Sequence, residues 1–180
     1  MSEWTAPFVY QLHPLLFGLN ALDLWDSINL VFLSYALLAF APRWTHTRSL
    51  TLVVPCLHSV IYIASFISAI RESHAKDDAP LDFFTLEGVV KGFENPNIVF
   101  VGWMHYIVFD HLVSRMIVLD SIQRGASWLV HYVFVVPCMF ATCMVGLTGF
   151  LTYILLRNVV LPENGSSEGG SSSQDKVKIL

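Results

Sequence analysis

The fold is decided by residues 97–121, which read NIVFVGWMHYIVFDHLVSRMIVLDS. At a rise of about 1.5 Å per residue, a helix of this length can cross the hydrocarbon core of a bilayer. Ionisable side chains nevertheless recur in it at a constant spacing of five, at His105, Asp110, Arg115 and Asp120. A step of five residues turns a helix by about 140°, so these side chains wind around it. We therefore expect this helix, which has no wide apolar side for lipid, at the centre of a helical bundle.

The composition points to a chain that uses lipid as part of its solvent. Hydrophobic residues make up 54% of the sequence, and charged residues only 13%, against about 25% in an average soluble domain. The mean hydropathy is +0.58. The net charge is −4 and there is no run of basic residues, so no nucleic-acid partner is expected. The three cysteines form neither a disulfide framework nor a metal motif, and no metal or cofactor is expected.

Three further apolar stretches accompany the central one. The four expected membrane helices are residues 22–41, 49–70, 97–121 and 127–157. The fold class predicted is therefore all-α, an integral membrane four-helix bundle over residues 21–157. Residues 1–20 form a segment before the first helix, and residues 158–180 form a flexible Gly/Ser-rich tail.

The connections between the helices and the ends of the chain support fewer predictions than the helices do. Residues 71–96 are expected to form an interfacial segment over one mouth of the bundle, and Pro55 and Pro137 are expected to kink their helices. Four spans would place both termini on one side of the membrane. Basic residues then divide almost evenly between the two sides, so no orientation is predicted. The first residues resemble neither a signal peptide nor a plastid transit peptide, and the organelle stays open.

Charged groups at bilayer depth require an explanation, because each costs at least about 2.5–3.5 kcal/mol. One interpretation is a structural network in which Asp110 pairs with His58, His131 or Arg115. The other is a functional site, which is the default for ionisable residues within a membrane. We favour the functional interpretation for His105 and Asp110. We favour the structural one for Asp120 and His111, with His58 in the same polar network.

The segment WMHYIVFDHLVSRMIVLDS carries the pattern W-x-H-x(4)-D-x(4)-R-x(4)-D, with Trp103 as its first residue. This pattern resembles the signature of the abscisic-acid-deficient-four-like membrane proteins, also called the neoxanthin synthase-like family. AFAPRW, LEGVVKGF and GLTGFLTY resemble other parts of that family in the same order, so the resemblance covers about residues 20–157. It implies a small four-helix membrane protein. Plant members of the family act in plastids and are needed to form the carotenoid neoxanthin.

The resemblance and the polar helix together suggest a redox-neutral isomerase of an apolar carotenoid or isoprenoid epoxide. In this hypothesis Asp110 is the acid, His105 is the base, and Arg115 steadies developing negative charge. The side chains expected to bind the substrate are Trp103, Tyr106, Phe109 and His131.

The alternative is a non-enzymatic membrane protein that binds a lipid or pigment or assists assembly. A transporter is a third, weaker hypothesis, because four helices are few for a transport path. The expected partners are the lipid bilayer and a carotenoid or other isoprenoid ligand, and a homo-oligomer is left open.

Overall fold

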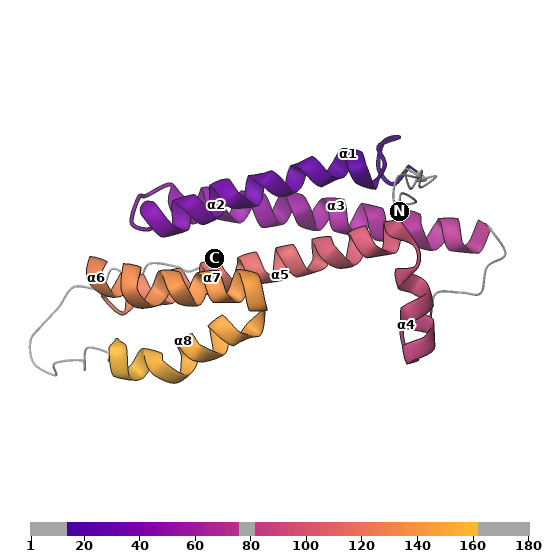
Figure 1. The fold of residues 1–180 in the computed structure, drawn as a ribbon. Coiled ribbons are helices and arrows are strands. Elements are labelled where there is room, and N and C mark those ends of the chain that lie inside the picture. The colour runs from indigo at the N-terminus through magenta and orange to yellow at the C-terminus, as the bar shows by residue number, and fades with distance from the viewer. Residues whose placement is uncertain (1–13, 76–81, 162–180) are drawn as a thin grey trace, which may run out of the picture.

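A computed structural model describes residues 14–75 and 82–161 of the chain, and these residues are helical with no strand among them (Figure 1). The elements are α1 (Ala21–Trp25), η1 (Asp26–Ile28), α2 (Asn29–Phe40), α3 (Thr47–Ala75), α4 (Leu86–Phe93), α5 (Pro96–Gln123), α6 (Trp128–Val130), the π-helical η2 (His131–Val135), α7 (Val136–Val145) and α8 (Leu147–Val160). The all-α prediction is confirmed, but the prediction of four helices is wrong.

Three helical runs are long and apolar enough to cross a membrane: Ala21–Phe40, Thr47–Glu72 and Trp128–Val145. Only 28% of the apolar window of each run is buried within the protein. Their outer sides therefore present wide apolar surfaces, which monomers in water rarely do. The central helix α5 is also long, but its ionisable residues lower its hydropathy and it is not among these three runs.

Polar side chains cap the N-termini of α1 and α5. The side chain of Asn20 accepts hydrogen bonds from the backbone N–H groups of Leu22 and Asp23, while Asp23 accepts from the N–H of Asn20 in return. This capping box begins α1. Asn95 caps α5, and Pro96 follows in its first turn, where the missing N–H has no cost.

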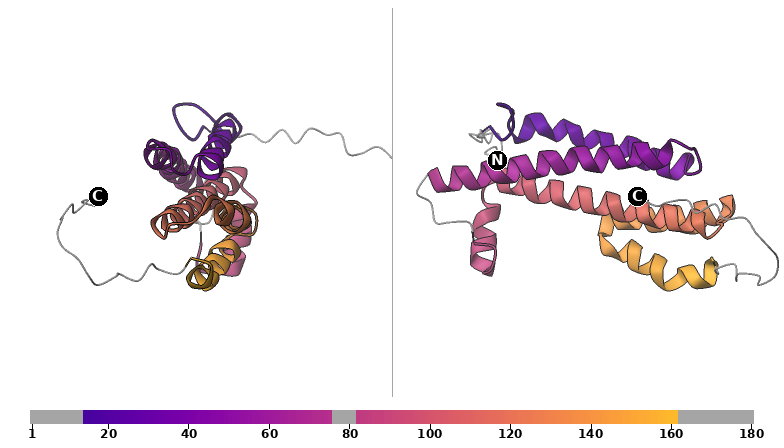
Figure 2. Two further views of the ribbon diagram at one scale, coloured as in Figure 1. Left: turned by 90° about the vertical axis from the view of Figure 1, so that its left-hand side faces the viewer. Right: turned by 180° about the vertical axis from the view of Figure 1, so that it is seen from behind.

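The expected helix at 127–157 divides at Gly146, and this division is the main reason why the four-helix prediction fails. Gly146 has φ +65° and ψ −133°, a conformation that side chains with a Cβ rarely adopt. The chain reverses there, and α8 packs back along α7 (Figure 2). Close packing requires Gly149, because a Cβ at this position would lie 2.1 Å from the carbonyl oxygen of Cys138.

Pro137 also alters this segment, as the sequence suggested. Proline has no N–H to continue the regular α-helical pattern. In the turn before it, the N–H of Val136 bonds to the carbonyl of His131, five residues earlier, and residues 131–135 form a π-helix. Such turns are uncommon and usually confined to a single widened turn of a helix.

The prediction that the polar helix is central is confirmed. α5 contacts α1, α2, α3, α4, α7, α8 and η2. In both views of Figure 2 it lies between the α2–α3 pair and the α7–α8 pair. The larger buried core joins α2, α5, α7 and α8, and a smaller core joins α1, α3 and α5.

The reversal at Gly146 changes where the chain ends. Arg157 near the end of α8 bonds to Asp120 near the end of α5. The start of α1 and the end of α8 therefore lie at opposite ends of the molecule (Figure 1). The two termini, which four spans would place on one side, lie outside the described residues. Helix α8 continues to Val160, so the expected tail boundary at 158 is too early. The rest of that tail, and residues 1–13 of the first segment, lie outside the described residues.

This arrangement also changes which basic residues of the described chain lie at each end of the molecule, compared with the expectation from the sequence. One end, formed by the α2–α3 connection and the last turns of α5 and α8, carries Arg43, Arg48, Arg124 and Arg157. We call it the arginine end. At the opposite end, near α4, the described basic residues are Arg71 and Lys91.

Candidate functional site

The side chains of the polar helix diverge, as their spacing predicts. His105 faces α3, where its ring lies 5.6 Å from that of Tyr62. Asp110 interacts electrostatically with Tyr35 and Cys143 on α2 and α7. Arg115 donates to a backbone carbonyl in the first turn of α3. The three side chains assigned to catalysis from the sequence are therefore not brought together around one ligand.

A cavity of ≈ 260 Å³ opens beside His105, between α3, α5, and α4 with the segment that leads into it. Its lining residues are Tyr62, Phe66, Phe83, Phe93, Ile98, Val101, Gly102, His105 and Tyr106. A methyl group at Gly102 would lie 3.3 Å from the ring of Phe93, so this glycine contributes to the open space. We call this space the aromatic pocket.

The aromatic pocket has the character of a ligand site. Aromatic and aliphatic side chains make up most of its lining, and the lining residues with polar groups are His105, Tyr62 and Tyr106. Small-molecule sites commonly combine an apolar lining with a few polar groups in this way. Its ≈ 260 Å³ is below the about 300–1,000 Å³ of typical ligand sites, so only part of an elongated ligand would lie inside it.

The four residues expected to bind substrate separate into different places. Tyr106 lines the aromatic pocket. Trp103 stacks on Trp25 at 6.4 Å between ring centroids and is half-exposed. Phe109 is exposed on the outer surface of α5. His131 lies at the arginine end of the bundle, where its Nε2 bonds to the carbonyl of Ala39 at 3.0 Å.

Three buried histidines connect helices instead of pairing with Asp110. His58 bonds to the Ser27 carbonyl at 2.9 Å, and His111 bonds to the Ser34 hydroxyl at 2.8 Å. His131 makes the third such bond, described above. In the interpretation of a structural network, Asp110 was expected to pair with His58, His131 or Arg115. The structure shows other partners for all three, and Asp110 has no hydrogen bond or ion pair within residues 14–75 and 82–161.

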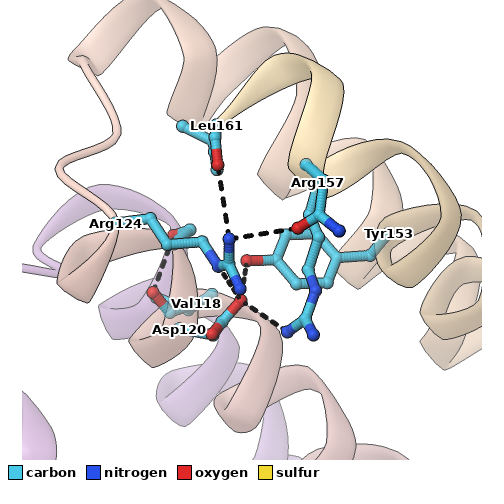
Figure 3. Close-up of polar contacts among 8 residues, drawn as sticks. Val118, Asp120, Arg124, Tyr153, Arg157 and Leu161 are labelled. Carbon is cyan, nitrogen blue, oxygen red and sulfur yellow. Dashed lines mark hydrogen bonds and ion pairs between the residues drawn. The ribbon is translucent and has the colours of Figure 1, made fainter. Parts of the chain in front are cut away.

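The most connected polar cluster surrounds Asp120 (Figure 3). One oxygen of its carboxylate, Oδ2, accepts from the Tyr153 hydroxyl at 2.6 Å, from Arg124 Nε at 3.0 Å and from Arg157 Nη1 at 3.1 Å. Arg124 also reaches the side chain of Asn158 and the carbonyl of Leu161. We call this set the Asp120 cluster. It joins the end of α5 to the end of α8.

Sequence reasoning missed two members of the aromatic pocket on α3. Tyr62 and Phe66 stand four residues apart and therefore on one side of the helix. Their rings stack at 5.9 Å. Two aromatic residues four positions apart on an apolar helix are therefore a sequence signal for this side of the pocket. Within the described ranges, no group of three His, Cys, Asp or Glu side chains could bind a metal ion.

The fold and these sites together define a class: a helical protein with three runs apolar enough to cross a membrane and a polar helix at its centre. The chain belongs to the ABA4-like family, described as ABA DEFICIENT 4-like, whose pattern matches residues 24–153. This match includes the signature from Trp103 to Asp120. No curated protein and no solved structure matches the chain.

Proposed function

We propose that this protein is embedded in a membrane and acts on an oxygenated isoprenoid of the carotenoid class, whose ring end enters the aromatic pocket. The observation that carries the proposal is that His105, Tyr62 and Tyr106 are among the residues lining an otherwise apolar cavity. The lipid-like exterior of the three long helical runs supports the membrane location. An apolar ligand would reach the pocket from the surrounding lipid.

The proposed reaction is a redox-neutral isomerisation of an epoxide to an unsaturated alcohol. A hydroxyl of Tyr62 or Tyr106 donates a proton to the epoxide oxygen while the carbon–oxygen bond breaks. His105 takes a carbon-bound proton, and a new double bond forms in its place. The proton released to His105 returns to the tyrosine through solvent, so atoms balance and no electrons leave the substrate. Asp110 and Arg115 lie away from the pocket and have no part in this step.

The test is expression in a host that makes epoxy-carotenoids, with chromatography of the pigments formed. We expect His105→Gln to lower conversion by about 100-fold or more, because general acid–base groups contribute about 10²–10⁴-fold. Gly102→Val should also lower conversion, because its side chain would fill part of the pocket against Phe93. His46→Gln is the matched control, since His46 is an exposed histidine in the connection between α2 and α3. Full conversion by the His105→Gln variant would refute the proposal.

A second candidate is a non-enzymatic protein that binds a pigment or lipid in the same pocket. It is favoured by the divergence of His105, Asp110 and Arg115, which do not meet around one ligand. In this case the purified protein would retain an epoxy-carotenoid unchanged, and Gly102→Val would abolish retention.

A further inference from the structure

Two arginines meet on the side of the bundle opposite the Asp120 cluster. Arg48 lies in the first turn of α3 and is exposed. Arg115 on α5 is half-buried and donates from Nη2 to the backbone carbonyl of Arg48 at 2.9 Å. Its Nε is buried and has no hydrogen-bond partner. A buried N–H of a charged group without an acceptor is costly, which suggests that an acceptor is bound there.

No carboxylate among the described residues compensates these two charges. Arg124 and Arg157 at the same end share Asp120, whereas Arg48 and Arg115 form no ion pair within residues 14–75 and 82–161. Helix α3 has no acidic residue in its first turn. The positive charges of Arg48 and Arg115 are close enough to interact, so an anion bound between them would stabilise both.

Aromatic side chains place this site at the depth of lipid headgroups. Trp44 and Trp128 are each almost half exposed at the arginine end of the molecule. Arg43 lies over the Trp128 ring at 4.6 Å from its centroid. Tryptophan is enriched at the boundary between the membrane and water. Arg48 and Arg115 are thus near that boundary and not at the centre of a bilayer.

We propose that Arg48 and Arg115 bind the phosphate of an anionic phospholipid headgroup. The planar guanidinium groups match phosphate oxygens with paired N–H donors. The free Nε of Arg115 gains an acceptor in the phosphate. This site lies apart from the aromatic pocket and does not depend on the function proposed for it.

The test uses the full chain purified in detergent, with binding measured by native mass spectrometry. The probes are short-chain phosphatidylglycerol, short-chain phosphatidylcholine and inorganic phosphate. We expect phosphatidylglycerol to bind at least about tenfold more tightly than phosphatidylcholine, because both lipids carry a phosphate but the choline ammonium of phosphatidylcholine is repelled by the two guanidinium groups. Arg48→Gln and Arg115→Gln should each remove this preference. Arg71→Gln, an exposed arginine at the opposite end of α3, is the matched control and should keep it.

Arg48→Lys and Arg115→Lys separate binding from folding, because lysine keeps the charge but not the paired donors. A weakened preference in these folded variants supports the proposal. Equal binding of inorganic phosphate and phosphatidylglycerol identifies a free phosphate as the ligand and overturns the lipid assignment. An unchanged preference for phosphatidylglycerol in both glutamine variants, or no preference in the natural chain, overturns the site itself.

Discussion

The Asp120 cluster yields the sharpest stability prediction, for the substitution Asp120→Asn. The buried Tyr153 donates to the carboxylate, and a hydrogen bond to a charged group contributes about 1.5–3 kcal/mol. The ion pairs with Arg124 and Arg157 are partly exposed, with side-chain exposures of 9% and 28% for the arginines and 26% for Asp120. We assign them about 0.5 kcal/mol each because water screens them. An asparagine oxygen retains part of the Tyr153 bond, so the expected net loss is about 2 kcal/mol.

A loss of this size should lower the midpoint of thermal unfolding by about 4–8 °C, since 1 kcal/mol corresponds to about 2–4 °C for a chain of this length. The assay is thermal unfolding in detergent followed by circular dichroism. Tyr153→Phe should cost less, and the double variant should cost less than the sum of the single variants, because both remove the same bond. Asp26→Asn, at the exposed start of η1, is the control. A midpoint for Asp120→Asn within about 1 °C of the natural chain, or full additivity, would refute the reasoning.

Three other predictions concern packing and orientation. Gly149→Ala should destabilise the α7–α8 hairpin by about 1–3 kcal/mol, because the added methyl overlaps Cys138 and Thr142; thermal unfolding measures this, and an unchanged midpoint would contradict it. Ser34→Ala should cost about 1–3 kcal/mol in the same assay, because it leaves both ring nitrogens of His111 unbonded in the core; a neutral result would mean that water replaces the hydroxyl. The 41–46 connection should face the cytoplasmic side, because the arginine end carries the basic residues; a single cysteine placed there should resist a membrane-impermeant thiol reagent applied from outside, and ready labelling would reverse the assignment.

Periodicity and length were enough to predict the first three long helices. Residues 22–41, 49–70 and 97–121 correspond to the α1–α2 run, α3 and α5, whose ends extend by a few residues. The winding of charges around α5 also predicted its central position. These features depend on local sequence, because apolar length and helical angle are properties of one segment at a time.

The reversal at Gly146 could not be predicted in the same way. Hydropathy continues across it without interruption, and a glycine within an apolar stretch is often accommodated inside a helix. The turn depends on a tertiary contact, the close approach of Gly149 to the backbone at Cys138. The reversal also places Arg157 at the arginine end, so this position could not be predicted either. The number of basic residues at each end of the molecule therefore differs from the one expected from the sequence.

Partners of the polar side chains were predicted less well than their positions. The sequence suggested acid–base pairs, but His58, His131 and Arg115 bond to backbone carbonyls. Every residue offers a carbonyl, so the sequence contains no signal for such a partner. The spacing of Tyr62 and Phe66 indicated one side of the aromatic pocket, but the pocket itself forms only where α3, α5, and α4 with the segment before it meet.

The π-helix before Pro137 fixes the rotational phase between α6 and α7. Deleting one residue from His131–Val135 would restore an ordinary helical turn and rotate everything before it by about 100° relative to α7. Trp128 would then turn away from Arg43, and the contact between that guanidinium and the indole ring would be lost. Chain length in this segment is therefore as constrained as residue identity, and a single deletion should be more damaging there than most substitutions.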